Sequence, residues 1–117
     1  MREEKFKVIQ FIRKLILEVD KELENFPKKD LEIKNRLRTS SYDLLELAYE
    51  ANSTKNLEFK QELLTRMIAK IKIMDFLLNL SYDKNLLTER KYLKLAKIID
   101  DIAKYTNGWQ KNIVGQS

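Results

Sequence analysis

Apolar side chains recur three or four residues apart along four long stretches of this chain, and no other feature constrains its fold as strongly. Residues at this spacing share one face of an α-helix, so each stretch predicts a helix with one buried stripe. Glycine occurs twice and proline once in 117 residues, and no stretch carries the signal of a β-hairpin. The chain is therefore predicted to be all-α.

Breaks between the stripes set the expected bounds of the first two helices. They are predicted at residues 4–25 and 31–52. Pro27 separates them, because proline disfavours helical geometry at the residue before it. Asp30 is expected to cap the second helix through its carboxylate.

The second half of the chain predicts two more helices. The third carries the richest apolar stripe, over residues 63–80, and the polar run 52–54 is expected to cap it. The fourth begins with Thr88 as its cap, and Gly108 is expected to end it. Trp109 follows that glycine and is predicted to fold back over the last turn, in a structural role rather than as a platform for stacking bases.

Four helices of this length joined by short links predict an antiparallel up-down-up-down four-helix bundle. One domain covering residues 1–117 is expected, because a chain of this length holds one hydrophobic core. Hydrophobic residues make up 44% of the chain, which is too apolar for a disordered protein. A three-helix arrangement, with the first helix swung onto a neighbouring subunit, is the main structural alternative.

The third helix carries more apolar surface than the core of one bundle needs. Ile73, Phe76 and Leu80 lie beside the main stripe and are predicted to form an oligomer interface. Burying each of them on a partner could contribute roughly 1.5–3 kcal/mol before the costs of association. The alternative is a monomer with a few exposed apolar residues, which most protein surfaces carry.

The composition points away from catalysis. Cysteine and histidine are both absent, which removes disulfides, thiolate nucleophiles, the usual zinc ligands and the commonest proton-transfer group. The di-iron motif of helical bundles needs histidine, and no glycine-rich phosphate loop occurs. We therefore expect no enzyme activity, no catalytic or metal-binding residue and no cofactor. The alternative is an enzyme that uses an unrecognised carboxylate site, which metal analysis of the purified protein would test.

The chain also lacks the patterns that direct proteins to membranes. No apolar run reaches the roughly 20 residues that cross a bilayer. The N-terminal residues do not have the apolar stretch of a signal peptide. A cytoplasmic protein without a membrane partner is the simplest expectation.

Positive charge is concentrated near the C-terminus. The net charge is +5, and residues 84–117 hold seven basic and three acidic side chains. Basic side chains that form a row on one helix face can follow a phosphate backbone, although a run of charged residues is often only a solvated helix face. The predicted nucleic-acid-binding residues are Arg90, Lys94, Lys97 and Lys104 on the fourth helix with Lys91 beside them, and a weaker patch of Arg36 and Arg38 on the second helix.

Three tyrosines lie near these cations in the sequence. Tyr82, Tyr92 and Tyr105 could stack on nucleic-acid bases. Aromatic residues at helical spacing more often pack in a core or an interface, so we expect these rings to pack on protein.

Several short strings occur in an order and at spacings that resemble a known family. They are Phe26-Pro27-Lys28, Leu37-Arg38, Leu45-Glu46-Leu47, Glu50-Ala51-Asn52 and Gly108-Trp109, with the leucine-rich third helix between the last two. Over about residues 12–112 the chain is similar to the small four-helix proteins related to the accessory variability determinant of diversity-generating retroelements. Relatives of that family are encoded in intervening sequences of bacterial large-subunit ribosomal RNA genes.

The resemblance implies a barrel-like homopentamer of four-helix subunits with a basic surface. In the retroelement members this assembly binds the element's reverse transcriptase and its template RNA without catalysing a reaction. By that analogy Arg36, Arg38, Arg90, Lys94 and Lys97 are candidates for contact with RNA, DNA or the polymerase. The alternative is an intervening-sequence-type scaffold that binds no nucleic acid specifically.

Overall fold

The chain folds into four long helices and one short turn of 3₁₀-helix. The computed structural model describes the backbone of residues 2–116 and the side chains of residues 5–113. In chain order the elements are α1 (Arg2–Glu22), η1 (Lys28–Asp30), α2 (Leu31–Ser53), α3 (Leu57–Asp83) and α4 (Glu89–Gln116). The predicted all-α, four-helix fold is confirmed, and the described residues contain no strand.

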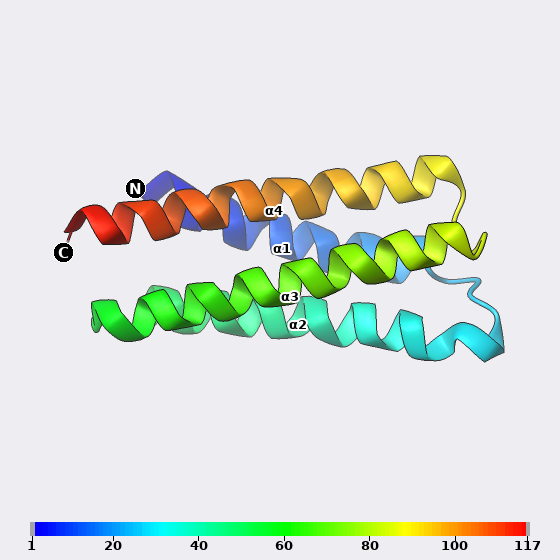
Figure 1. The fold of residues 1–117 in the computed structure, drawn as a ribbon, viewed down its shortest axis with the longest axis horizontal. Coiled ribbons are helices and arrows are strands. Elements are labelled where there is room, and N and C mark those ends of the chain that lie inside the picture. The colour runs from blue at the N-terminus through cyan, green and yellow to red at the C-terminus, as the bar shows by residue number, and fades with distance from the viewer. Residues whose placement is uncertain (1, 117) are drawn as a thin grey trace.

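The four helices lie side by side along the longest dimension of the molecule (Figure 1). Each helix packs against two others: α1 and α3 both pack against α2 and α4. The start of α1, the end of α4 and the α2–α3 connection lie at one end of the bundle, and the other two connections lie at the opposite end. The described part of the chain measures 47 × 22 × 20 Å and contains no helix that is long and apolar enough to cross a membrane.

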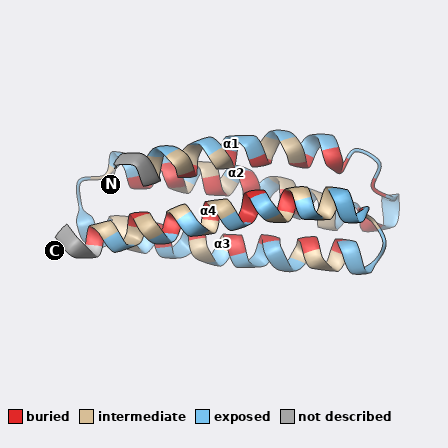
Figure 2. Cartoon of the chain, turned by 90° about the horizontal axis from the view of Figure 1, so that it is seen from above, coloured by how far each residue is buried: buried red, intermediate tan, exposed pale blue. Residues whose placement is uncertain are grey.

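The core fills the space between the four helices, where the buried positions face inward (Figure 2). Large side chains come mainly from α1, α3 and α4, whereas α2 places four small residues in the core. Small residues on α2 let the neighbouring helices approach closely. Large side chains from those helices then pack directly over the small residues and fill the core. The small core residues of α2 are Ser40, Ser41, Ala48 and Ala51.

Two predicted helix caps differ in the structure. Asp30 precedes α2, but its side chain makes no capping hydrogen bond. Its Oδ1 instead accepts a hydrogen bond from Lys84 at 2.7 Å. Asp30 is only 3% exposed, and a buried carboxylate is stabilised more by a cation than by an amide. Asn56, not the run 52–54, caps α3 by accepting from the Phe59 amide at 3.0 Å. Thr88 caps α4 as predicted, through the Lys91 amide at 3.2 Å.

Gly108 does not end the fourth helix. Helix α4 continues to Gln116, and Gly108 does not have a positive φ. A glycine inside a helix costs roughly 1 kcal/mol relative to alanine. Burial of Trp109 and Ile113, which are 3% and 4% exposed, offsets that cost. The prediction that Trp109 is covered is confirmed, although it lies within the helix rather than after it.

Candidate nucleic-acid interface

Four basic residues occupy the outer face of α4 at intervals of seven. They are Arg90, Lys97, Lys104 and Lys111, and all four are exposed. Seven residues make almost two helical turns, so such residues share one face, and successive members lie about 10 Å apart along the axis. Sequence reasoning set Lys111 outside the helix because Gly108 was expected to end it.

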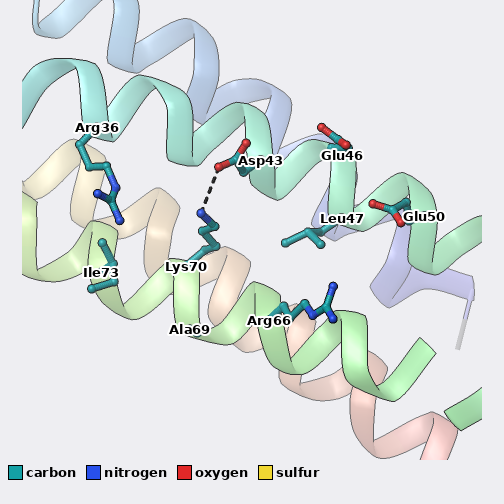
Figure 3. A pocket seen from close by; sticks show the side chains of 9 residues that line it. All are labelled: Arg36, Asp43, Glu46, Leu47, Glu50, Arg66, Ala69, Lys70 and Ile73. Carbon is teal, nitrogen blue, oxygen red and sulfur yellow. Dashed lines mark hydrogen bonds and ion pairs between the residues drawn. The ribbon is translucent and has the colours of Figure 1, made fainter. Parts of the chain in front are cut away.

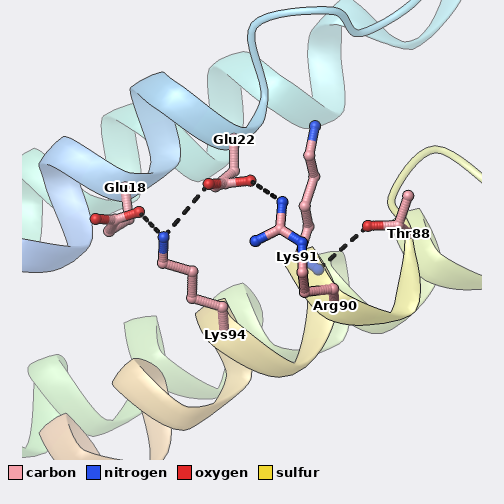
Figure 4. A network of polar contacts seen from close by, with 6 residues as sticks. All are labelled: Glu18, Glu22, Thr88, Arg90, Lys91 and Lys94. Atoms are coloured by element: carbon pink, nitrogen blue, oxygen red, sulfur yellow. Dashed lines mark hydrogen bonds and ion pairs between the residues drawn. The ribbon is translucent and has the colours of Figure 1, made fainter.

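Lys94 was predicted to belong to this row, but its side chain turns toward α1 (Figure 4). Its Nζ lies 2.9 Å from Glu18 Oε2 and 3.5 Å from Glu22 Oε1. Arg90 Nη2 lies 3.9 Å from the second oxygen of Glu22, whose side chain is only 5% exposed. Two cations of α4 thus compensate two carboxylates of α1 and hold the two helices together.

These contacts shift the pKa values of the partners. The hydrogen bond and the charge of Lys94 hold the pKa of Glu18 below its ordinary value, against a smaller opposing effect of desolvation. Glu18 raises the pKa of Lys94 in turn. On the outer face, Asp101 accepts from Lys97 at 2.8 Å and raises the pKa of that lysine. Both lysines therefore stay charged throughout the neutral range.

Reversing the charge of Lys94 is expected to destabilise the bundle clearly. Lys94→Glu would place a third carboxylate beside Glu18 and Glu22, and Glu22 would lose the closer of its two cations in a site that water hardly reaches. The matched control is Lys97→Glu, because the Lys97 side chain is 74% exposed and its partner lies on the same helix. Urea unfolding should give a lower midpoint for Lys94→Glu than for Lys97→Glu; equal midpoints would show that the α1–α4 ion pairs are not structural.

Glu18 should make the free energy of unfolding depend on pH in the acidic range. Its folded-state pKa lies below the unfolded value, so its stabilising contribution is complete above the unfolded pKa and is lost as the pH falls through the folded pKa. Glu18→Gln is therefore expected to be slightly less stable than the wild type at pH 7. The difference in unfolding free energy should shrink once the pH falls below the unfolded pKa of about 4.3 and vanish below the lower pKa of the folded state. A difference that persists at strongly acidic pH would point to packing instead.

The other predicted cations lie on separate sides of the bundle. Arg38 Nε pairs with Asp20 of α1 at 2.9 Å. Arg36 is exposed and lines a groove between α2 and α3. Lys91 is partly buried near the start of α4. The seven predicted residues therefore do not form one surface, and Arg36 and Arg38 face different neighbouring helices.

The three tyrosines considered for base stacking are already engaged within the bundle. Tyr82 stacks on Tyr92 with ring centroids 4.7 Å apart, and Tyr92 donates a hydrogen bond to Asn79. Tyr105 stacks on Phe11 of α1 at 5.7 Å. These contacts support the expectation that the aromatic rings pack on protein.

The predicted interface residues form an exposed apolar row on α3. Ile73 is 43% exposed and Phe76 60% exposed, whereas Leu80 is partly buried. The row borders a groove of about 420 Å³ between α2 and α3 (Figure 3). The groove is lined by Arg36, Asp43, Glu46, Leu47, Glu50, Arg66, Ala69, Lys70 and Ile73.

The described residues thus present two candidate surfaces, the basic outer face of α4 and the apolar groove with its row on α3. Both suit binding to macromolecules, since one can follow phosphates and the other can bury apolar side chains of a partner. Comparison with protein-family models, with curated proteins and with solved structures finds no match for this chain.

Proposed function

We propose that this protein is a non-catalytic, cytoplasmic accessory protein of a diversity-generating retroelement. In this proposal antiparallel up-down-up-down bundles assemble as a barrel-like homopentamer that binds the element's reverse transcriptase and its template RNA. The order of short motifs, which resembles that of the retroelement family, supports the reverse transcriptase and its template RNA as the partners. The row of four exposed cations on the outer face of α4 is the observation that carries the nucleic-acid contact.

The row suits a nucleic-acid backbone by its length and its repetition. From Arg90 to Lys111 it extends over about 30 Å of helix, long enough to meet several phosphates of one strand. Assembly would repeat the row around a ring, so that weak contacts from several subunits act on one molecule. Phosphate contacts carry no base information, so little sequence preference is expected for RNA or DNA.

Charge reversal at Lys104 and Lys111 tests the contact without disturbing the α1–α4 ion pairs. The double variant should bind a mixed single-stranded RNA more weakly. The logarithm of its binding constant should also fall less steeply with the logarithm of the salt concentration, by roughly one unit of slope for each phosphate that the variant no longer binds. Lys28→Glu with Lys29→Glu is the matched control, because both lysines are exposed on η1, away from α4. If only the control loses affinity for RNA, the RNA does not bind at the basic row of α4.

The ion pairs favour a second candidate, an intervening-sequence-type scaffold without specific nucleic-acid binding. Arg38, Arg90, Lys94 and Lys97 each lie within 4 Å of a carboxylate, which lowers the charge that they offer to phosphates. An oligomer that binds no RNA at low salt would select this candidate. A reverse transcriptase gene beside the coding sequence would support the accessory role, whereas a ribosomal RNA gene would oppose it.

A further inference from the structure

We infer that a groove between α3 and α4 receives an unpaired nucleobase of the strand whose phosphates lie along the basic row of α4. The protein then favours single-stranded over duplex nucleic acid. The groove, which we call the amide groove, has a volume of about 500 Å³ and is lined by Gln61 of α3 and by Asn107, Gln110 and Lys111 of α4. The inference rests on the proposed nucleic-acid contact and names the form of nucleic acid that this contact selects.

The amide groove adjoins the C-terminal half of the basic row. Asn107 lies about one helical turn from both Lys104 and Lys111, and Lys111 belongs to the row and to the groove lining alike. Gln61 reaches the groove from the neighbouring helix, because the start of α3 and the end of α4 lie at the same end of the bundle (Figure 1). A phosphate held by Lys111 therefore brings the base attached to it to the mouth of the groove.

Three of the four lining residues carry side-chain amides. An amide has an oxygen that accepts hydrogen bonds and a nitrogen that donates two, and the edges of nucleobases present the same two kinds of group. Phosphate oxygens only accept, so a phosphate would use just the donors of these amides. The lining includes no carboxylate that would repel a nucleic-acid strand. A groove that supplies both donors and acceptors therefore suits a base better than a phosphate.

Two of the amides differ in how the chain holds them. Gln110 Nε2 donates a hydrogen bond to Thr65 Oγ1 of α3 at 3.1 Å, which fixes this amide and leaves its Oε1 as an acceptor for a ligand. Gln61 Oε1 is buried and has no hydrogen-bond partner among the described residues. A half turn of the Gln61 amide exchanges its oxygen and nitrogen without breaking a bond to that oxygen. Gln61 can therefore offer either an acceptor or a donor to a base.

An unpaired base is the form of nucleobase that fits this groove. In a duplex the Watson–Crick edge of each base is bound to the complementary strand, whereas in a single strand it is free to bond to protein. Because the Gln61 amide can turn and Asn107 is exposed, the groove requires a free base but not a particular one. Charge alone would favour the duplex, which carries phosphates more densely along its axis. A preference for single strands is thus the result that distinguishes the amide groove from the basic row.

An abasic strand tests the amide groove, because it keeps every phosphate and lacks the bases. The wild type should bind a mixed-sequence single-stranded DNA more tightly than an abasic strand of the same length, by about two- to tenfold for each hydrogen bond to a base. It should also bind the single strand more tightly than the duplex at the same salt concentration. Fluorescence anisotropy measures these affinities.

Gln61→Ala with Asn107→Ala removes two of the three amides and no charge. This double variant should lose most of the difference between the intact and the abasic strand, while the salt dependence of its binding stays that of the wild type. The matched control is Gln10→Ala with Asn35→Ala, because both of these amide residues are exposed and lie on α1 and α2, outside the groove. The control should discriminate the two strands as the wild type does, and circular dichroism should show the same helical content in all three proteins.

The outcomes separate the groove from the proposed nucleic-acid contact. If the wild type binds no single-stranded DNA or RNA at low salt, that contact and this inference both fail. If the wild type binds intact and abasic strands equally, or binds the duplex more tightly than the single strand, only the inference about the amide groove is wrong. The same conclusion follows if the groove variant discriminates the two strands as well as the control does.

Discussion

Trp109→Ala is expected to lower the free energy of unfolding by about 3–5 kcal/mol, the range for removing a buried large aromatic side chain. The indole is only 3% exposed and belongs to the core cluster, so its loss leaves a cavity between helices that pack along their whole length. Urea unfolding followed by circular dichroism measures the change, since the variant lacks the tryptophan that fluorescence would report.

Phe59→Ala is the matched control for this measurement. Phe59 is also an aromatic residue on a helix, but it is 38% exposed at the start of α3. Its removal should therefore cost much less than removal of Trp109. Unchanged stability of Trp109→Ala, together with a loss of RNA binding, would instead assign the indole to a nucleic-acid contact.

Phe76→Glu is expected to dissociate the proposed oligomer into subunits of 14.0 kDa while the helical content stays the same. Phe76 is 60% exposed in the single chain, so a charge there meets water in the monomer and does not disturb the core. In an assembled interface the same charge would be buried without a partner, at a cost of several kcal/mol. Light scattering at micromolar concentration distinguishes the two states.

Two controls make the Phe76 result specific. Phe59→Glu places the same charge on an exposed aromatic position of α3 outside the predicted interface, and it should leave the assembly intact. Met74→Glu alters a fully buried residue two positions from Phe76 and should unfold the chain. If Phe76→Glu unfolds the protein as Met74→Glu does, Phe76 belongs to the core and not to an interface.

The sequence by itself determined the four helices, but not every residue that they bury: Phe6 belongs to the predicted apolar stripe of the first helix and is 60% exposed. Apolar periodicity depends only on local helical geometry, so the second helix was predicted at 31–52 and is observed at Leu31–Ser53. The cap at Thr88 also follows from local geometry, because the hydroxyl and the amide that it binds are three residues apart. The burial of Trp109 was predicted for a different geometry, an indole that folds back after the end of the fourth helix, whereas Trp109 is buried from within α4.

Only the tertiary structure decided which polar groups of separate elements meet. Lys94 pairs with Glu22 from 72 residues away, and Asp30 pairs with Lys84 from 54 residues away, because packing of separate helices brings them together. Those pairings remove Lys94 from the basic row and the Asp30 carboxylate from its predicted cap. Packing also decided the length of α4: a glycine is a local signal to stop, but burial of the side chains beyond it stabilises the helix by more than the glycine costs.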